Sequence, residues 1–490
     1  MKDFRTLFLN RETVISMCIK CYCILSIYLL FAGCTNHPKT RTIYAGEWGI
    51  TLNSDVYKGG GTDMTKKLQA LLDKAPEWGR LHLILDGAAL VSRSIKIHSN
   101  TTIECPDKSC GLFLADSSNC SVICNANGDL KNIRDHNITL IGGVYNNNSP
   151  GQVHHLGEMY NKNSPGPGDN TVHFMSNWVF AMSFYGVENF IMRDVTIANQ
   201  RTFAMLMANW KYVTMENIHI DRKERADHQN QDGLHFFGPG RFLTLRNIYG
   251  NSGDDFIALA PDEHDLESSI EDVLIDGVHL EDADQGIRLL SRNNGKLDRV
   301  FIRNVTGTYR SYGFFVIPHY GGNCSHYGNI VFDMIDLRPL KNNYDHERPF
   351  LFRFEGNMES ITLKNIYHHT PDFDHTLFIV KGVSYKQPGN NTTKIRRLMI
   401  DGLYVDEQNK NSLPDTYIDV QDGADIDLLS VKNVIIRRAD GLPKHASLVR
   451  VKKDSSISEL LLNDVSAPCL NKLLDAPVGS IYRIEKNNVE

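Results

Sequence analysis

The chain has 490 residues, of which 41% are hydrophobic and 22% are charged. This composition is typical of a globular protein with a large buried core, and it excludes a disordered, collagen-like or disulfide-knotted chain. The formal net charge is −6 and the isoelectric point is near 6.3. Because no overall positive charge surrounds the protein, we expect no nucleic acid among its partners.

Residues 1–33 resemble a signal peptide of the lipoprotein type. Basic residues precede an apolar run from Cys21 to Ala32, which is too short to span a bilayer comfortably. The run ends in Leu-Phe-Ala-Gly-Cys, similar to the cleavage motif of bacterial lipoproteins. We therefore expect cleavage before Cys34, a lipid anchor on Cys34 and attachment to a membrane of the bacterial cell envelope, at the outer membrane or in the periplasm. An ordinary secretory signal, giving a secreted protein, is the alternative.

Residues 34–490 are interpreted as a single domain, because no long Pro/Gly/Ser linker divides them. Near its start, Gly59 to Asp63 lead into an amphipathic segment, MTKKLQALLDKA, which predicts a helix that caps one end of the fold. Four cysteines follow closely enough in sequence to predict one or two disulfides in an oxidising compartment: Cys105, Cys110, Cys120 and Cys124.

The strongest pattern in the chain is a repeat. Short runs of alternating apolar residues, each interrupted by Asn or Asp, recur in steps of roughly 23 to 36 residues, as in VTMENIHI around Asn217 and LTLRNIYG around Asn247. Alternation with a period of two and many β-branched residues predict strands, so each repeat is interpreted as one coil of a solenoid. The fold class predicted is all-β, a right-handed, single-stranded parallel β-helix with an N-terminal capping helix. The repeated Asn and Asp residues are expected to form its corners, since both tolerate the left-handed conformation.

Candidate catalytic residues gather on three successive coils. Asn230-Gln231-Asp232-Gly233 is followed by Ser252-Gly253-Asp254-Asp255 and then by Asp284-Gln285-Gly286-Ile287-Arg288. Asp232 and Asp255 are about one coil apart, so we expect their carboxylates on neighbouring rungs of one face, within reach of the same glycosidic bond. Carboxylates this close raise the pKa of at least one of them, which provides a proton donor beside an ionised neighbour.

These motifs resemble those of the polygalacturonases, glycoside hydrolase family 28, within the wider group of pectin-lyase-like parallel β-helix proteins. The family carries Asn-x-Asp and, one coil later, Asp-Asp after Gly or Gln, and Asn230 to Asp232 and Gly253 to Asp255 match this order and spacing. The resemblance implies a polysaccharide-degrading enzyme that works by inverting hydrolysis without a cofactor. It also implies that Asp254 or Asp255 is the general acid and that the remaining carboxylates, Asp232 included, activate water.

The chain departs from the family where the substrate binds. The family pattern has Gly-His-Gly on the next coil, where this chain has Asp284-Gln285-Gly286, and Phe315-Val316-Ile317 stands where Arg-Ile-Lys would bind a galacturonate carboxylate. Arg288 offers a planar cationic fork for a uronate instead. The substrate-binding residues predicted are Asn230, Gln285, Arg288, His319 and Tyr320, and the substrate predicted is an extracellular glycan that contains uronic acid.

Two alternatives stay open at this point. In a polysaccharide lyase that acts by β-elimination, Ca²⁺ would bind to carboxylates, and Arg288 or the pair His319 and Tyr320 would abstract a proton; the ligands would be Asp232, Asp254, Asp255 and Asp284. In a non-catalytic glycan-binding surface protein, aromatic side chains would stack on sugar rings; the candidates are Trp178, Trp210, Phe236, Phe237, Tyr309, Tyr312 and Tyr320.

Overall fold

The structure is a computed structural model that describes residues 40–490 except 154–177, 224–229, 319–324, 342–347, 385–391, 408–413 and 440–443. The predicted signal peptide, Cys34, His319 and Tyr320 therefore lie outside the described residues. In the part that is described, no helix is long and apolar enough to cross a membrane.

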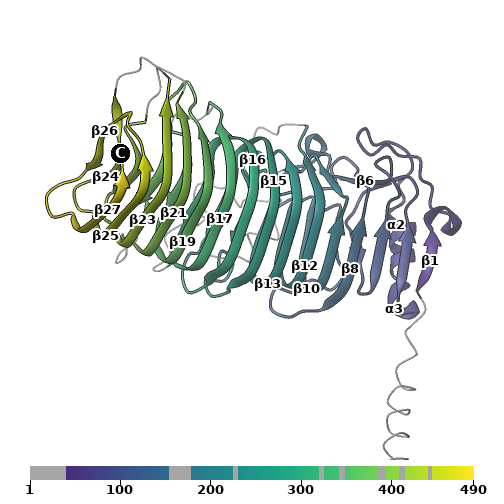
Figure 1. Ribbon diagram of the computed structural model, residues 1–490. Helices are drawn as coiled ribbons and strands as arrows, with labels where there is room; N and C mark the ends of the chain where they lie inside the picture. The colour runs from purple at the N-terminus through teal and green to yellow at the C-terminus, as the bar shows by residue number, and fades with distance from the viewer. Residues whose placement is uncertain are drawn as a thin grey trace, which may run out of the picture.

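The chain winds into a parallel β-helix, as the repeat predicts (Figure 1). Within the described residues all the strand pairings are parallel, and each coil pairs with the coil before and after it. Long strands bend across two or three faces of the coil, whereas short strands occupy one face. In chain order, the strands are β1 (Arg41–Tyr44), β2 (Leu81–Ile84), β3 (Ala88–Val91), β4 (Ile95–Ile97), β5 (Thr101–Glu104), β6 (Gly111–Leu114), β7 (Ile123–Asn125), β8 (Asp135–Ile141), β9 (Val144–Asn146), β10 (Met182–Arg193), β11 (Thr196–Ala198), β12 (Met205–Asp221), β13 (Leu234–Gly250), β14 (Asp255–Ala260), β15 (Ile270–Leu290), β16 (Lys296–Ile317), β17 (His326–Pro339), β18 (Phe350–Phe354), β19 (Asn357–His369), β20 (Thr376–Lys381), β21 (Thr393–Glu407), β22 (Thr416–Gln421), β23 (Ala424–Arg438), β24 (His445–Val451), β25 (Ser456–Ser466), β26 (Leu470–Asp475) and β27 (Ile481–Val489).

The core is one continuous column of buried side chains that runs from Ile43 in the first coil to Leu470 near the last. A single coil cannot cover its own inner face, so the coils stabilise one another by stacking Ile, Val, Leu and Phe from rung to rung. Each such side chain, when fully buried, contributes about 1.5–3 kcal/mol.

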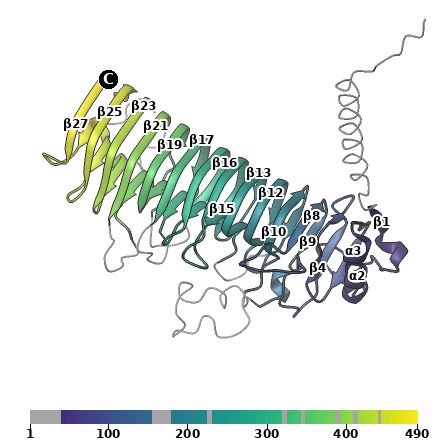
Figure 2. The ribbon, with the colours of Figure 1, turned by 90° about the horizontal axis from the view of Figure 1, so that it is seen from below.

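The predicted capping helix is confirmed at the N-terminal end of this column. Helix α2 (Thr65–Leu72) buries Leu68, Leu71 and Leu72 in the column, and the shorter α3 (Ala75–Trp78) follows it. Figure 2 shows both helices beside β1, at the opposite end of the solenoid from β27. Two short 3-10 helices, η1 (Ala45–Trp48) and η2 (Ser149–Gly151), complete the helical segments of the described residues.

The repeated Asn residues have the structural role predicted for them. Asn217 and Asn247 adopt left-handed backbone angles, with φ of 55° and 51°. The Asn247 amide donates a hydrogen bond to Asn217 at 2.8 Å, and the Asn217 amide donates one to Asp194 at 2.8 Å. Each corner residue therefore links its coil to the preceding one.

The predicted disulfides are wrong, because Cys105, Cys110, Cys120 and Cys124 are all free thiols. Close spacing in sequence does not fix the direction of the Cα–Cβ bonds, which a disulfide requires to face each other. Cys110 instead donates a hydrogen bond to Asp107 at 3.6 Å. Burial raises the pKa of the Cys105 thiol to about 12, so this side chain acts as a small apolar core residue.

Candidate active site

The candidate catalytic residues lie on consecutive rungs of one outer face, which we call the site face. Asp232 directly precedes β13, and Asp255 is the first residue of β14. The Gly233 N–H donates a hydrogen bond to the Asp255 carbonyl at 2.8 Å, which joins the two coils at this point. Asp255 pairs with Gln285 in β15, and Gln285 pairs with Tyr312 in β16. The predicted rung-to-rung neighbourhood is therefore confirmed.

Two glycines allow the coils to approach closely here. A Cβ atom on Gly233 would lie 2.2 Å from the Phe256 carbonyl oxygen, and a Cβ atom on Gly253 would lie 2.4 Å from the Arg222 guanidinium. Both distances are far inside van der Waals contact. At Gly233 the clash is with backbone, so only glycine fits there without a shift of the chain, whereas at Gly253 the Arg222 side chain would have to move. The glycines in the two motifs thus set the spacing between Asp232 and the Asp254-Asp255 pair.

Asp255 is buried and held by two polar groups. Its carboxylate forms an ion pair with the Arg288 Nε atom at 3.3 Å, and it lies within hydrogen-bond distance of the Tyr312 hydroxyl. The same hydroxyl also contacts the Gln285 side-chain oxygen. Since a hydroxyl carries one proton, Tyr312 can donate it to the carboxylate or to Gln285, but not to both.

Asp254 is more accessible than Asp255. Its side chain is half-buried, and one carboxylate oxygen accepts a hydrogen bond from the Asn230 backbone N–H at 3.0 Å. Its main-chain carbonyl accepts a hydrogen bond from the Ser252 hydroxyl at 2.8 Å, which fixes the turn before β14. Asp254 is therefore the carboxyl group of this pair that is better exposed to a bound substrate.

Asp232 belongs to a buried triad with His235 and Glu263. The His235 ring contacts Asp232 through Nδ1 at 2.7 Å and Glu263 through Nε2 at 3.1 Å. Its face stacks on Phe203 with ring centroids 4.6 Å apart. Both ring nitrogens face carboxylate oxygens, so both are suited to carry a proton, and the ring is an imidazolium between two anions.

The pKa values in the site are shifted because its charged groups are buried and are not fully balanced by groups of opposite charge. Burial raises the pKa of Asp255 to about 6, with the Arg288 cation opposing the rise and the Asp254 charge adding to it. Burial also raises the pKa values of Asp232 and Asp254. For His235, burial lowers the pKa, but the hydrogen bonds to Asp232 and Glu263 outweigh it and raise the pKa to about 10. Burial therefore favours the protonated forms of the three aspartates, whereas the two carboxylates beside His235 favour its charged form.

Two buried apolar clusters lie in the coils around these charges. On the N-terminal side of the site face, one cluster contains Trp178, Phe180, Phe203 and Phe237. On the C-terminal side, a second cluster contains Tyr312, Phe315, Ile317 and Phe350. A site between such walls strengthens every electrostatic interaction within it.

The structure brings most of the predicted site residues together. Asp232, Asp254 and Asp255 influence one another's pKa, and Gln285 and Arg288 adjoin Asp255. Asp284 is buried on the next coil, where its backbone N–H donates a hydrogen bond to the Ser252 carbonyl at 3.3 Å, and its charge also helps to raise the pKa of Arg310. The predicted contributions of His319 and Tyr320 fall outside the described residues.

Among the described residues, no three His, Cys, Asp or Glu side chains are placed to hold a metal ion. The arrangement therefore gives no support to the four-carboxylate calcium site of the lyase alternative. The sugar-stacking alternative is also weakened, because its candidates Trp210, Phe236, Phe237 and Tyr309 are almost fully buried.

Sequence reasoning missed His235 and Glu263. The sequence did contain a signal for His235, because it is the one polar residue in the apolar strand segment Leu234–Phe237. In the structure it pairs with Ala258 on the next rung, which in turn pairs with Arg288. Glu263 follows β14 in a turn, where no periodic pattern marks it. It follows His235 by 28 residues, about one coil, which is the spacing that brings the two side chains together.

Comparison with known proteins agrees with this architecture. Residues 125–279 match the sequence model of the family described as Glycosyl hydrolases family 28, and this range includes all three aspartates. No curated protein sequence matches the chain.

Solved structures of similar shape are distant in sequence. The tailspike protein of the E. coli bacteriophage HK620, in complex with a pentasaccharide, is 10% identical, with a TM-score of 0.54 over 87% of this chain and 75% of that one. The A-module of the mannuronan C-5 epimerase AlgE4 from Azotobacter vinelandii is 11% identical, with a TM-score of 0.51 over 90% and 100%. An exopolygalacturonase from Thermotoga maritima is 12% identical, with a TM-score of 0.42 over 79% and 93%.

The first two likenesses support the fold, and the family match covers the coils that carry the carboxylates. The protein is thus a parallel β-helix glycoside hydrolase that resembles family 28 over residues 125–279.

Proposed function

We propose that the protein hydrolyses glycosidic bonds in a uronic-acid-containing, pectin-like polysaccharide by a single-displacement, inverting mechanism. One observation carries the proposal: within the range that matches family 28, three aspartates lie on adjacent coils, and burial raises the pKa of each of them. Inverting hydrolysis needs one protonated carboxyl group and one ionised carboxylate at the same bond.

Asp254 is proposed as the general acid. Its raised pKa keeps a proton available, and its partial exposure lets the carboxyl group reach a glycosidic oxygen. The Asn230 N–H contact orients the carboxyl group.

Asp255 is proposed as the general base that activates water, together with Asp232. Arg288 and Tyr312 both favour its ionised form, so that it loses its proton above a pKa of about 6. His235 holds the Asp232 carboxylate in one orientation and supplies a positive charge beside it. These residues need no metal ion or organic cofactor for proton transfer.

Arg288 is proposed to have two roles. Its Nε atom faces Asp255, and a terminal nitrogen lies 3.5 Å from the Gln285 oxygen. The guanidinium group has five N–H donors, so it can contact a uronate carboxylate while it remains paired with Asp255. Asn230 and Gln285 border the same space and complete the proposed substrate contacts.

The proposal is tested by incubating the purified mature protein with polygalacturonate and other uronate polysaccharides, with and without EDTA. New reducing ends without ultraviolet absorbance of unsaturated uronates, with the first product of inverted anomeric configuration by NMR, are the expected result. Absorbance that rises with the reducing ends and is lost in EDTA would contradict the hydrolase proposal and favour the lyase.

We also propose that the mature protein is attached to the cell envelope through a lipid on Cys34, where it meets extracellular glycans. The support is the sequence motif that ends at Cys34. Incorporation of labelled palmitate into the unchanged protein, and its loss in Cys34→Ala, is the expected outcome; a label that persists in the variant would contradict the anchor.

A further inference from the structure

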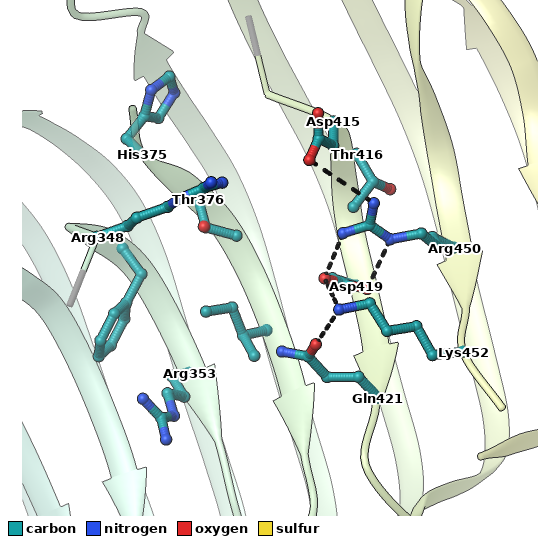
Figure 3. A pocket seen from close by; sticks show the side chains of 12 residues that line it. Arg348, Arg353, His375, Thr376, Asp415, Thr416, Asp419, Gln421, Arg450 and Lys452 are labelled. Carbon is teal, nitrogen blue, oxygen red and sulfur yellow. Dashed lines mark hydrogen bonds and ion pairs between the residues drawn. The ribbon is translucent and has the colours of Figure 1, made fainter. Parts of the chain in front are cut away.

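A second polar site lies on the site face, toward the C-terminal end of the solenoid. It is a pocket of about 500 Å³ bordered by β18, β20, β22 and β24. Figure 3 shows Arg450 and Lys452 on one side of it, with Asp419 between them and Arg353 across the opening.

The strand register connects this pocket directly to the catalytic coils. Arg288 pairs with Phe315, which pairs with Arg353, and the same line of paired residues continues through Ile379 and Asp419 to Arg450. Arg353 is thus two rungs from Arg288, or about 10 Å. Asp419 and Arg450 follow two and three rungs further along, so the pocket and the catalytic carboxylates line one straight track.

Buried aromatic side chains fill the interval between the two sites. The Tyr312 ring stacks on Phe350 with centroids 5.4 Å apart, and Phe350 lines the pocket. The Arg353 guanidinium lies over Phe315 at 4.9 Å and over Phe350 at 5.6 Å. These packed rings therefore hold Arg353 and the strands of the two sites in a fixed arrangement.

The charges in the pocket are fixed in place and are positive in excess. Arg450 forms a two-pronged contact with Asp419, at 3.0 Å and 2.7 Å, and the Lys452 ammonium lies 3.5 Å from the same carboxylate. Asp419 is buried, whereas Lys452 keeps about two-fifths of its side chain exposed. One buried carboxylate thus orients two cations, and among the described residues the only other acid lining the pocket, Asp415, lies 4.0 Å from Arg450 and is mostly exposed.

Arg353 is held rigidly on the opposite side. Its Nε atom donates to Glu355 at 2.6 Å, and a terminal nitrogen donates to the Ser384 hydroxyl at 2.5 Å. Glu355 is fully buried. A preorganised guanidinium loses little conformational freedom when a ligand binds, which favours affinity.

We propose that this pocket is a distal subsite that binds an anionic sugar unit, through its carboxylate or a sulfate ester, on the same glycan chain that is cleaved at Asp254 and Asp255. The inference rests on the proposed function for the identity of that chain. Arg450 and Lys452 bind the anionic group, and Ile379, which is partly exposed in the pocket, contacts the apolar side of the sugar ring. The enzyme consequently prefers substrates long enough to reach both sites.

The test measures binding by isothermal titration calorimetry in an Asp255→Asn background, so that the ligand is not cleaved. The ligands are a galacturonate hexamer for the carboxylate, a κ-carrageenan hexasaccharide, which carries sulfate esters but no carboxylate, for the sulfate ester, and maltohexaose as the uncharged control. Lys452→Met removes a charge from a half-exposed side chain, and Arg450→Lys keeps the charge but removes the planar fork. Lys432→Met, an exposed cation on a wall strand, is the matched control.

We expect Lys452→Met and Arg450→Lys each to weaken binding of at least one anionic hexamer about tenfold, as for loss of one charge-assisted contact. Lys432→Met and maltohexaose should show no such dependence, and the anionic hexamer that is more affected identifies the group that is bound. Equal affinity in all variants, or no binding of either anionic hexamer to the background protein, would overturn the subsite. Hydrolysis is assayed separately in the protein with Asp255 intact. If no hydrolysis is found but binding depends on Lys452, the hydrolase proposal fails and the subsite stands. If hydrolysis is found but the variants bind as tightly as the background protein, only the subsite is refuted.

Discussion

The catalytic cluster and the distal pocket lie on one face of the same solenoid, but they balance charge in opposite ways. In the catalytic cluster, the half-buried Asp254 and the buried Asp232 and Asp255 influence one another's charge, and the nearby cations are Arg288 and His235. In the pocket, the buried Asp419 is contacted by two cations. The first region has an excess of acid and the second has an excess of base.

This difference separates chemistry from binding. Carboxylates that cannot all ionise retain a proton near neutral pH, which acid–base catalysis requires. Cations already oriented by a carboxylate keep their charge and offer fixed donors, which suits recognition of an anion. One line of paired strand residues runs through both regions. The identity of the residue at each outward-facing position of this line therefore decides whether a region is acidic or basic.

The largest effect is expected when the acid is removed from the catalytic cluster. Asp254→Asn should lower kcat on the cleaved polysaccharide about 10³-fold, because the proton donor is lost while the side chain keeps its shape. The matched control is Asp427→Asn, which changes an exposed acid on the wall strand β23. Reducing-end assays measure both variants. Near-normal activity of Asp254→Asn, or an equal loss in Asp427→Asn, would contradict the assignment.

The next effect concerns the residue that positions Asp232. His235→Gln should lower kcat about 10²-fold, since the imidazolium that orients Asp232 is replaced by a neutral amide. Loss of that cation also raises the pKa of Asp232 further, so the acidic limb of the profile of kcat/KM against pH should move to higher pH. His279→Gln, at an exposed wall position, is the control. Reduced activity with an unmoved pH profile would assign His235 a purely structural role.

A smaller effect is expected from the hydrogen bond to the base. Tyr312→Phe removes a hydroxyl that favours ionised Asp255, so the pKa of Asp255 should rise above about 6. The base is active only above its pKa; activity should therefore fall several-fold near pH 5.5 and change little near pH 8. Tyr309→Phe serves as the control, because within the described structure its buried hydroxyl has no hydrogen-bond partner. A uniform loss of activity at all pH values would refute this role for Tyr312.

The sequence predicts that the aspartates of the cluster lie close together, because the spacing between their motifs equals the length of one coil. Asp232 and Asp255 are separated by one repeat, so recognising the repeat already places them on neighbouring rungs. His235 and Glu263 meet for the same reason, but neither belongs to a motif, and a single polar residue in a strand does not reveal its partner.

The distal pocket could not be predicted in this way. Its charged residues come from three separate coils: Arg353, Asp419 and Arg450. They align only because every strand pairing between them has the right register, and the sequence does not show that register. The cysteines fail for a related reason. Repeat patterns fix which rung a residue occupies, whereas a disulfide depends on side-chain direction within a turn.

The smallest expected effects are on stability, and they have opposite signs in the two regions. The folded-state pKa of Asp254 is raised, so its ionised form costs folding free energy, and this cost appears as pH rises through the folded pKa. Asp254→Asn should therefore leave the free energy of unfolding unchanged or increased at pH 7, and any gain should vanish below about pH 4, where the carboxyl group is protonated in both states.

Asp419→Asn should lower the free energy of unfolding at pH 7 by about 1–3 kcal/mol, since Arg450 and Lys452 lose the carboxylate between them. Denaturant titrations of both variants at pH 4 and pH 7 measure these changes, and destabilisation by Asp254→Asn at pH 7 would show that its charge is balanced in the folded protein after all.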